Sequence, residues 1–339
     1  FRSRSGTDGA ANLALALEAL AAAADDGADL IVLPEYASRF DPHGVGREHA
    51  EPLDEGFVAA LRRAAGECGI AVIVGTTAPM GDRAANVVVA IDADCGLVGT
   101  YRKVHLYDAF GTRESDRLEA GAPDAPPLLM EVGGLVVGVL TCYDLRFPES
   151  ARRLVDAGAT VLAVPAAWAA GEHKADHWRT LLRARAIEST CYVLAAVQIG
   201  PGVTGESAVI DPDGVVLARA LPQALGDGPA SGGGPPPTAA AADLSSAVVS
   251  ATRDRNPSLA NRRYAVVPAG TSAAGQVGSD SDVPAAAQVG SDSDVPAAAQ
   301  VGSDSDGPAA AQVGSDSDGP AAAAPPVRAL WDRWLLAAW

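Results

Sequence analysis

Cys142 is the residue whose type and surroundings best suit covalent chemistry. The apolar run 135–140 precedes it and polar, turn-forming residues follow it, which indicates a strand passing into a helix. A thiol near a helix N-terminus lies close to exposed N–H groups and to the positive end of the helix dipole, which favour the thiolate. The same N–H groups can stabilise an oxyanion when the sulfur attacks a carbonyl carbon. We therefore expect Cys142 to be a nucleophile, and interpret Cys68, Cys95 and Cys191 as structural thiols.

A nucleophilic cysteine needs a base and a group that stabilises the oxyanion. Glu35 follows the apolar run 30–33 and Pro34, and a partly desolvated carboxylate there is suited to exchanging protons. Lys103 could stabilise the oxyanion with its ammonium group without transferring a proton. Lys103 and Lys174 are the only two lysines of the chain. From the residues alone, Glu35 could equally be an exposed strand-end residue and Lys103 a solvated surface residue.

The five histidines do not form an evident set of partners for the cysteine. His173 and His177 have the i,i+4 spacing of two metal ligands on a helix, but Lys174 lies between them and no third ligand motif accompanies them. The sequence therefore argues against a metal site at this pair, and hydrolysis by a cysteine nucleophile with Glu35 and Lys103 requires no metal and no organic cofactor.

Short apolar runs alternate with segments of helical periodicity, which predicts an α/β layered domain whose sheets are buried on both faces. Strands are expected over 29–33, 70–76, 86–91, 97–101, 128–132, 135–141, 160–164, 191–198, 206–210 and 215–218, and helices over 9–27, 54–67, 148–157 and 175–189. Glu35, Cys142 and Trp168 lie just past the C-terminal ends of expected strands, where the loops of α/β folds commonly carry functional residues.

The composition argues against several other classes of protein. A formal charge of −17 argues against nucleic-acid partners, and no apolar run reaches the roughly 18 residues that predict a membrane span. The first residues lack the uninterrupted apolar core of a signal peptide. The four scattered cysteines, with no Cys-x-x-Cys pair, are typical of reduced thiols. We therefore expect a cytoplasmic protein.

We expect the folded part of the chain to end well before residue 339. Residues 225–242 are rich in Gly, Pro and Ala and are interpreted as an insertion, and from Gln276 a twelve-residue unit recurs four times. Each unit has only one or two Val as large apolar residues, too little to offset the entropy of ordering. We therefore expect a folded domain over 1–268, a disordered region over 269–326 and a short apolar tail over 327–339. The tail could be a docking peptide, a membrane-surface segment or an artefact of gene prediction.

Three segments resemble the signature blocks of the nitrilase or carbon–nitrogen hydrolase superfamily, in the family's order and approximate spacing. They are Leu33-Pro-Glu35, Tyr101-Arg-Lys-Val-His-Leu106 and Cys142-Tyr-Asp-Leu-Arg-Phe-Pro-Glu149. Two later segments also resemble the family, Arg183-Ala-Arg-Ala-Ile-Glu188 and Asn256-Pro-Ser-Leu-Ala-Asn-Arg-Arg263, and the likeness covers about 8–265. Any one block would be a weak signal, but three in order are a specific one.

The resemblance implies a four-layer αββα sandwich that assembles as a homodimer or a higher homo-oligomer. It assigns Cys142 as the nucleophile, Glu35 as the general base and Lys103 as the oxyanion stabiliser. Glu114 matches a second family glutamate, which helps to position the lysine and the substrate.

Within the family, the chain looks closest to the amidase branch that contains deaminated-glutathione amidase and omega-amidase. This implies hydrolysis of a small amide through a cysteine thioester, with release of ammonia. Tyr143 (through its backbone N–H), Arg146 and Trp168 are the expected substrate contacts, and an arginine in the pocket would fit a substrate carboxylate. Helix capping by Arg146 and core packing by Trp168 are the alternatives. Omega-amidase or nitrilase activity, a non-catalytic interaction protein and a redox-sensing thiol protein are the alternative functions.

Two features depart from the family pattern. Residues 1–5 match poorly the strand that opens the family's fold, so a central strand is expected to be missing, which would leave neighbouring backbone groups unpaired. The segment Gly205-Glu206-Ser207 has Glu where related amidases often have His.

Overall fold

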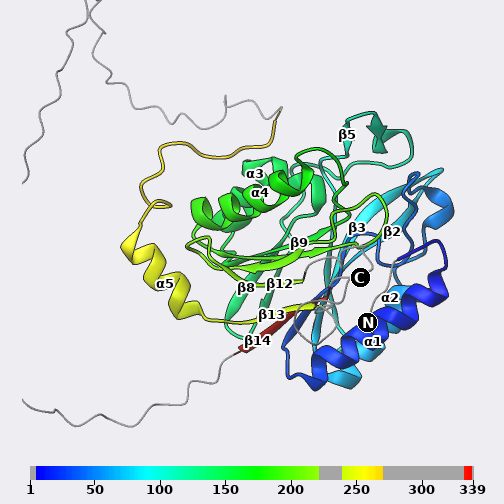
Figure 1. Ribbon diagram of the computed structural model, residues 1–339, viewed down its shortest axis with the longest axis horizontal. Coiled ribbons are helices and arrows are strands. Elements are labelled where there is room, and N and C mark those ends of the chain that lie inside the picture. Colours follow the sequence, from blue (N-terminus) through cyan, green and yellow to red (C-terminus); the bar gives the residue numbers. More distant parts are fainter. Residues whose placement is uncertain (1–4, 221–238, 270–331, 338–339) are drawn as a thin grey trace, which may run out of the picture. The chain divides into compact units, whose positions relative to one another are not determined.

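Two six-stranded sheets form the centre of the computed structural model, which describes residues 5–220, 239–269 and 332–337 (Figure 1). The first sheet consists, in order of neighbouring strands, of β13 (Ala239–Leu244), β14 (Asp332–Ala337), β1 (Leu30–Val32), β2 (Ala71–Met80), β3 (Arg83–Ile91) and β4 (Leu97–Arg102). The second sheet consists of β12 (Val216–Ala220), β11 (Ser207–Ile210), β10 (Tyr192–Val197), β9 (Val161–Ala166), β8 (Leu135–Val139) and β7 (Leu129–Val132).

Helices cover the outer face of each sheet, so that the domain has four layers (Figure 1). The helices α1 (Gly9–Asp25) and α2 (Gly56–Cys68) pack on the first sheet, and α3 (Pro148–Asp156) and α4 (Lys174–Ser189) pack on the second. The predicted αββα sandwich is therefore confirmed. A further helix, α5 (Ser246–Arg255), follows β13.

The strands are apolar along their length because both of their faces are buried. In β1, Leu30 and Val32 belong to the core between the two sheets, whereas Ile31 and the following Leu33 pack with residues of α1 and α2. Successive side chains of a strand point to opposite faces, so a strand between two cores needs apolar residues at every position.

Local signals in the sequence set the limits of α1. The side chain of Asp8 accepts hydrogen bonds from the backbone N–H groups of Ala10 and Ala11 at 3.0 and 3.2 Å, which pairs two of the donors that the first turn leaves free. After the helix, Gly27 has a φ of 76°, a conformation that glycine adopts without the steric cost of a Cβ atom.

The middle of the first sheet is occupied by a strand from far along the chain. β14 runs parallel to β1, with Trp334 paired to Leu30 and Leu336 paired to Val32, and antiparallel to β13 over the whole of that strand. The apolar tail, for which the sequence leaves three roles open, thus contributes a strand between β1 and β13. This is a central position in the sheet, with backbone partners on both sides.

Every strand and helix expected from periodicity is present, with bounds that differ by a few residues. The strands β13 and β14, the helix α5 and the short hairpin of β5 (Asp108–Ala109) and β6 (Thr112–Arg113) were not expected. Residues 239–242, the end of the expected insertion, belong to β13 because they pair with β14. The rest of the insertion and, apart from Ala269, the expected disordered region lie outside the described residues. No described helix is long and apolar enough to cross a membrane.

Candidate active site

Cys142 lies in a tight turn just after β8. It begins a short 3-10 helix, η3 (Cys142–Arg146), with a backbone φ of 46°, in the left-handed region that non-glycine residues seldom adopt. The carboxylate of Asp144 accepts a hydrogen bond from the backbone N–H of Thr141 at 3.0 Å and so holds the turn. Strained backbone of this kind persists only where the surrounding structure holds it, and it is typical of functional sites.

The Cys142 thiol is protonated in the resting site. Burial raises its pKa well above the ordinary value, and the negative charge of Glu35 raises the pKa further. The positive charge of Lys103 lowers the pKa, but by less than burial and Glu35 together raise it. The side chain is only 8% exposed and lies near a carboxylate, and these effects oppose the stabilisation of a thiolate that the helix N-terminus favours. The proton has to be removed during the reaction.

Lys103 is held between two carboxylates. Its Nζ lies 2.9 Å from Oε1 of Glu35 and 2.9 Å from Oε2 of Glu114, and the lysine is fully buried. Burial alone would lower the pKa of Lys103, but the charges of Glu114 and Glu35 outweigh it and raise the pKa well above the ordinary value. The raised pKa favours the charged ammonium form of Lys103 in the interior.

Glu35 is fixed by contacts from both sheets. Its Oε1 accepts a hydrogen bond from the side-chain amide of Asn86 at 2.6 Å, and its Oε2 accepts one from the backbone N–H of Ala167 at 2.7 Å. Its backbone carbonyl accepts a third, from Gln198, at 2.9 Å. With 1% of its surface exposed, Glu35 is a buried, oriented carboxylate and not an exposed residue at a strand end.

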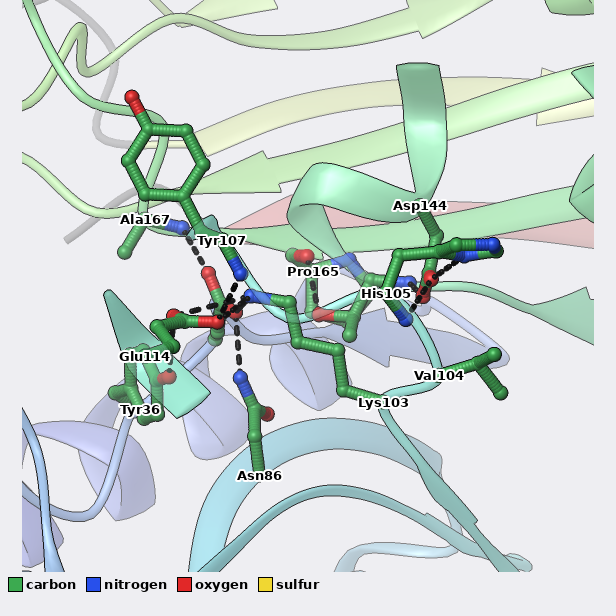
Figure 2. A network of polar contacts seen from close by, with 12 residues as sticks. Tyr36, Asn86, Lys103, Val104, His105, Tyr107, Glu114, Asp144, Pro165 and Ala167 are labelled. Carbon is green, nitrogen blue, oxygen red and sulfur yellow. Dashed lines mark hydrogen bonds and ion pairs between the residues drawn. The ribbon is translucent and has the colours of Figure 1, made fainter. Parts of the chain in front are cut away.

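Glu114 joins the same network from the opposite side of the lysine (Figure 2). The hydroxyl of Tyr36 donates to Oε1 of Glu114 at 2.9 Å, and the backbone N–H of Tyr107 donates to Oε2 at 2.8 Å. Tyr36 follows Glu35 directly, has a φ of 57° and is buried. Sequence reasoning missed Tyr36, whose position next to Glu35 was its only signal.

Asp144 connects the segment that carries Lys103 to the segment that carries Cys142. Its Oδ2 accepts a hydrogen bond from the Tyr101 hydroxyl at 2.7 Å. Its Oδ1 lies 2.7 Å from Nδ1 of His105 (Figure 2). Asp144 is completely buried. The same carboxylate that caps the cysteine turn therefore also holds the lysine segment, a role that the sequence did not reveal.

Replacing Asp144 with Asn is expected to reduce both stability and turnover. An amide NH₂ would face hydrogen-bond donors in place of an acceptor oxygen, and a buried donor left unpaired costs about 1–3 kcal/mol. We expect the midpoint of thermal unfolding to fall by about 2–10 °C and kcat to fall more than KM changes. Asp82→Asn, at an exposed turn after β2, is the matched control for the thermal measurement. An unchanged unfolding midpoint in Asp144→Asn would contradict this role.

The network opens onto a cavity of about 370 Å³. Residues expected to act in catalysis or to contact substrate line it together, namely Glu35, Glu114, Cys142, Tyr143, Arg146 and Trp168. Lys103 forms ion pairs with two of these residues, Glu35 and Glu114. The structure therefore brings all the expected site residues to one place.

Two further expectations concern the edge of this site. Arg146 does not cap a helix but stacks near Trp168, with its Cζ 4.9 Å from the ring centroid. Trp168 is 4% exposed, so it both packs in the core and lines the cavity. Glu206, which stands where related amidases often have His, receives a hydrogen bond from Nε of Arg179 at 2.7 Å and is not among the residues that line this cavity.

The chain is similar in sequence to several known proteins. The family model described as carbon–nitrogen hydrolase matches residues 4–227. A deaminated glutathione amidase from Escherichia coli O157:H7 is 38% identical over 259 residues, which cover 75% of this chain and 92% of the relative. A protein named as a hydrolase in Mycobacterium tuberculosis (strain ATCC 25618 / H37Rv) is 40% identical over 281 residues, covering 76% and 92%.

Solved structures of an amidase from Nesterenkonia sp. AN1 resemble the fold. One that shows Michael addition of acrylamide at the active site cysteine superposes with a TM-score of 0.57 at 28% identity, covering 65% of this chain and 86% of the amidase. The matched family model spans more than half of the chain, and it contains Glu35, Lys103, Glu114 and Cys142. The chain therefore belongs to the carbon–nitrogen hydrolase family.

Proposed function

We propose that this carbon–nitrogen hydrolase cleaves a small, carboxylate-bearing amide through a thioester on Cys142. One observation carries the proposal: Cys142, Glu35 and Glu114 line the same cavity, and Lys103 Nζ lies 2.9 Å from each of the two carboxylates. A nucleophile, a base and a buried cation are thus available to one bound amide group.

Acylation starts from the protonated thiol. As Sγ of Cys142 attacks the amide carbon, Glu35 takes the thiol proton. Lys103 and the backbone N–H of Tyr143 stabilise the negative charge that forms on the carbonyl oxygen. Because the two carboxylates outweigh the effect of burial and raise the pKa of Lys103, the ammonium group stays charged and acts by electrostatics, not by giving up its proton.

Deacylation uses the same groups with water as the nucleophile. The first tetrahedral intermediate collapses when Glu35 returns its proton to the departing nitrogen, which leaves as ammonia or an amine. A water molecule then attacks the thioester while Glu35 removes its proton, and the collapse of the second intermediate releases the carboxylic acid and restores the thiol. Glu114 holds Lys103 in place in both halves, and the cycle consumes only the amide and water.

Arg146 supports a substrate that carries a carboxylate. Its guanidinium group lies at the cavity that contains Cys142, and a guanidinium fork matches the geometry of a carboxylate. The relative named deaminated glutathione amidase makes deaminated glutathione the first candidate substrate.

The proposal is tested with a panel of compounds incubated with the folded protein. The panel contains deaminated glutathione, alpha-ketoglutaramate, simple primary amides and a nitrile, and the released amine or ammonia and the acid product are measured. We expect amide turnover, with the best substrate among the amides that bear a carboxylate. Turnover of the nitrile alone, or of no compound by folded protein, would contradict the proposal.

We also propose that the protein is a homodimer or a higher homo-oligomer in the cytoplasm. The resemblance to the family supports the assembly, and light scattering after size-exclusion chromatography tests it. All four cysteines are free thiols, which supports a reducing compartment.

A further inference from the structure

Two cationic side chains that line the cavity have no acidic partner. Lys174, the first residue of α4, is 7% exposed, and Arg146 lies at the end of η3. Within the part of the chain that the structure describes, neither side chain takes part in an ion pair. Nε of Arg146 is also buried without a hydrogen-bond partner. Burying a cation is costly unless an anion or strong acceptors accompany it.

The groups that contact the two cations are aromatic rings, the Tyr107 hydroxyl and the imidazole of His177, whose Nδ1 lies 3.4 Å from an Arg146 nitrogen. Nζ of Lys174 lies 2.9 Å from the Tyr107 hydroxyl and 3.3 Å from the centroid of the Phe110 ring. The Arg146 guanidinium lies 5.9 Å from the same Phe110 ring and 4.9 Å from the Trp168 ring. The aromatic side chains thus bring both cations to one side of the cavity, and burial and the charge of Arg146 lower the pKa of Lys174.

The acidic residues of the cavity are engaged elsewhere. Glu35 and Glu114 are paired with Lys103, and Asp41 accepts a hydrogen bond from the backbone N–H of His43 at 2.8 Å. The cavity therefore has an acidic side, at the catalytic network, and a cationic side, at Lys174 and Arg146. An amide whose far end carries a carboxylate has the matching distribution of charge.

We propose that Lys174 and Arg146 together bind the carboxylate of the amide substrate, and that Lys174 determines the preference for a charged over a neutral amide. This rests on the proposed function and adds a second cation to the single arginine considered there. Arg146 supplies the planar fork, and Lys174 supplies a second positive charge, a point charge, next to the same Phe110 ring. The substrate class is a short acyl amide with a terminal carboxylate.

The Lys174 side chain can be changed without removing the anchor of its backbone. The indole Nε1 of Trp168 donates to the backbone carbonyl of Lys174 at 2.9 Å, and this hydrogen bond does not involve the ammonium group. Lys174→Met keeps most of the length and apolar volume of the side chain. Lys174→Arg keeps the charge, and Arg63→Met, at an exposed position of α2, removes one positive charge far from the cavity.

The experiment measures binding in the Cys142→Ala background, so that it does not depend on turnover. The probes are glutaramate and its neutral isostere glutaramide, titrated by calorimetry into Cys142→Ala alone and into that protein with Lys174→Met, Lys174→Arg or Arg63→Met. We expect the parent to prefer glutaramate. Lys174→Met should reduce that preference by about 10- to 100-fold, the range expected for loss of one charge-assisted hydrogen bond. Lys174→Arg should restore part of the preference, and Arg63→Met should leave it as in the parent.

Other outcomes separate this inference from the proposed function. Equal losses for both probes in Lys174→Met would assign the lysine a purely structural role and overturn the inference. A parent protein that binds the two probes equally would overturn it as well. If the preference for glutaramate depends on Lys174 while folded wild-type protein turns over no amide, the inference stands and the proposed function fails.

Discussion

Replacing Cys142 with Ala is expected to lower amide turnover by about 10⁴-fold or more, because no other group in the cavity can form the thioester and loss of a catalytic nucleophile has effects of this order. The domain is expected to remain folded, since Asp144 holds the turn through the backbone of Thr141 and Ala removes only the Sγ atom of Cys142. The measurement is kcat/KM on the best amide of the panel, together with circular dichroism and thermal unfolding of the variant.

Cys191→Ala is the matched control for this result. Cys191 is also a buried free thiol, and burial raises its pKa to about 12, but it packs in the core between the second sheet and its helices. We expect this variant to lose some stability and to keep its turnover. Activity that survives in Cys142→Ala, or that disappears in a folded Cys191→Ala, would refute the assignment of the nucleophile.

Removing residues 332–337 is expected to unfold the domain or to lower its unfolding midpoint by more than about 10 °C. β14 is bonded on one side to β1 and on the other to β13, so its loss leaves two rows of backbone N–H and C=O groups unpaired. At about 0.5–1.5 kcal/mol net for each hydrogen bond, losing several of them removes a large part of the stability of an ordinary domain. Differential scanning calorimetry provides the measurement.

A control deletion and the addition of a peptide test whether the effect comes from the loss of β14 itself. Deleting residues 276–287, a single twelve-residue repeat, shortens the same part of the chain and leaves β14 in place, and we expect little change in the unfolding midpoint. A synthetic peptide of residues 330–339, added to the protein that lacks 332–337, should raise the midpoint again by supplying the strand. A deletion of 332–337 with an unchanged midpoint would show that β14 does not stabilise the first sheet.

The sequence predicted the strands and helices whose signals are local. β1 and β9 are continuous apolar runs because each lies between two cores, and that pattern can be read from a few neighbouring residues. The residues of β13 could not be recognised in this way, because they form an alanine-rich stretch next to a Gly- and Pro-rich segment. Their partner, β14, lies almost a hundred positions later, and no local pattern indicates such a pairing.

The identities of the catalytic residues could be predicted from the sequence, but the electrostatics of the site could not. Glu35, Lys103, Glu114 and Cys142 follow from motifs in a known order, and the structure brings them together. The raised pKa of the Cys142 thiol depends on burial and on a carboxylate from another segment, so its size could not be judged from the motif alone.

Residues that act through space were the hardest to recognise. The role of Asp144 depends on donors about forty positions earlier in the sequence. Lys174 had one signal, the scarcity of lysine in the chain, and only the folded structure places it beside Arg146 in the cavity.

The position of β14 also bears on how many repeats the chain can carry. Trp334 pairs with Leu30 across 304 positions (334 minus 30), so forming this pair closes a very long loop of chain. For a disordered connection, as the sequence predicts for 269–326, the entropy of closure grows only with the logarithm of length, by about 0.6 kcal/mol for each doubling. Gaining or losing a twelve-residue unit therefore changes the free energy of unfolding very little. The number of repeats can drift between related chains while the strand that follows them keeps its place in the sheet.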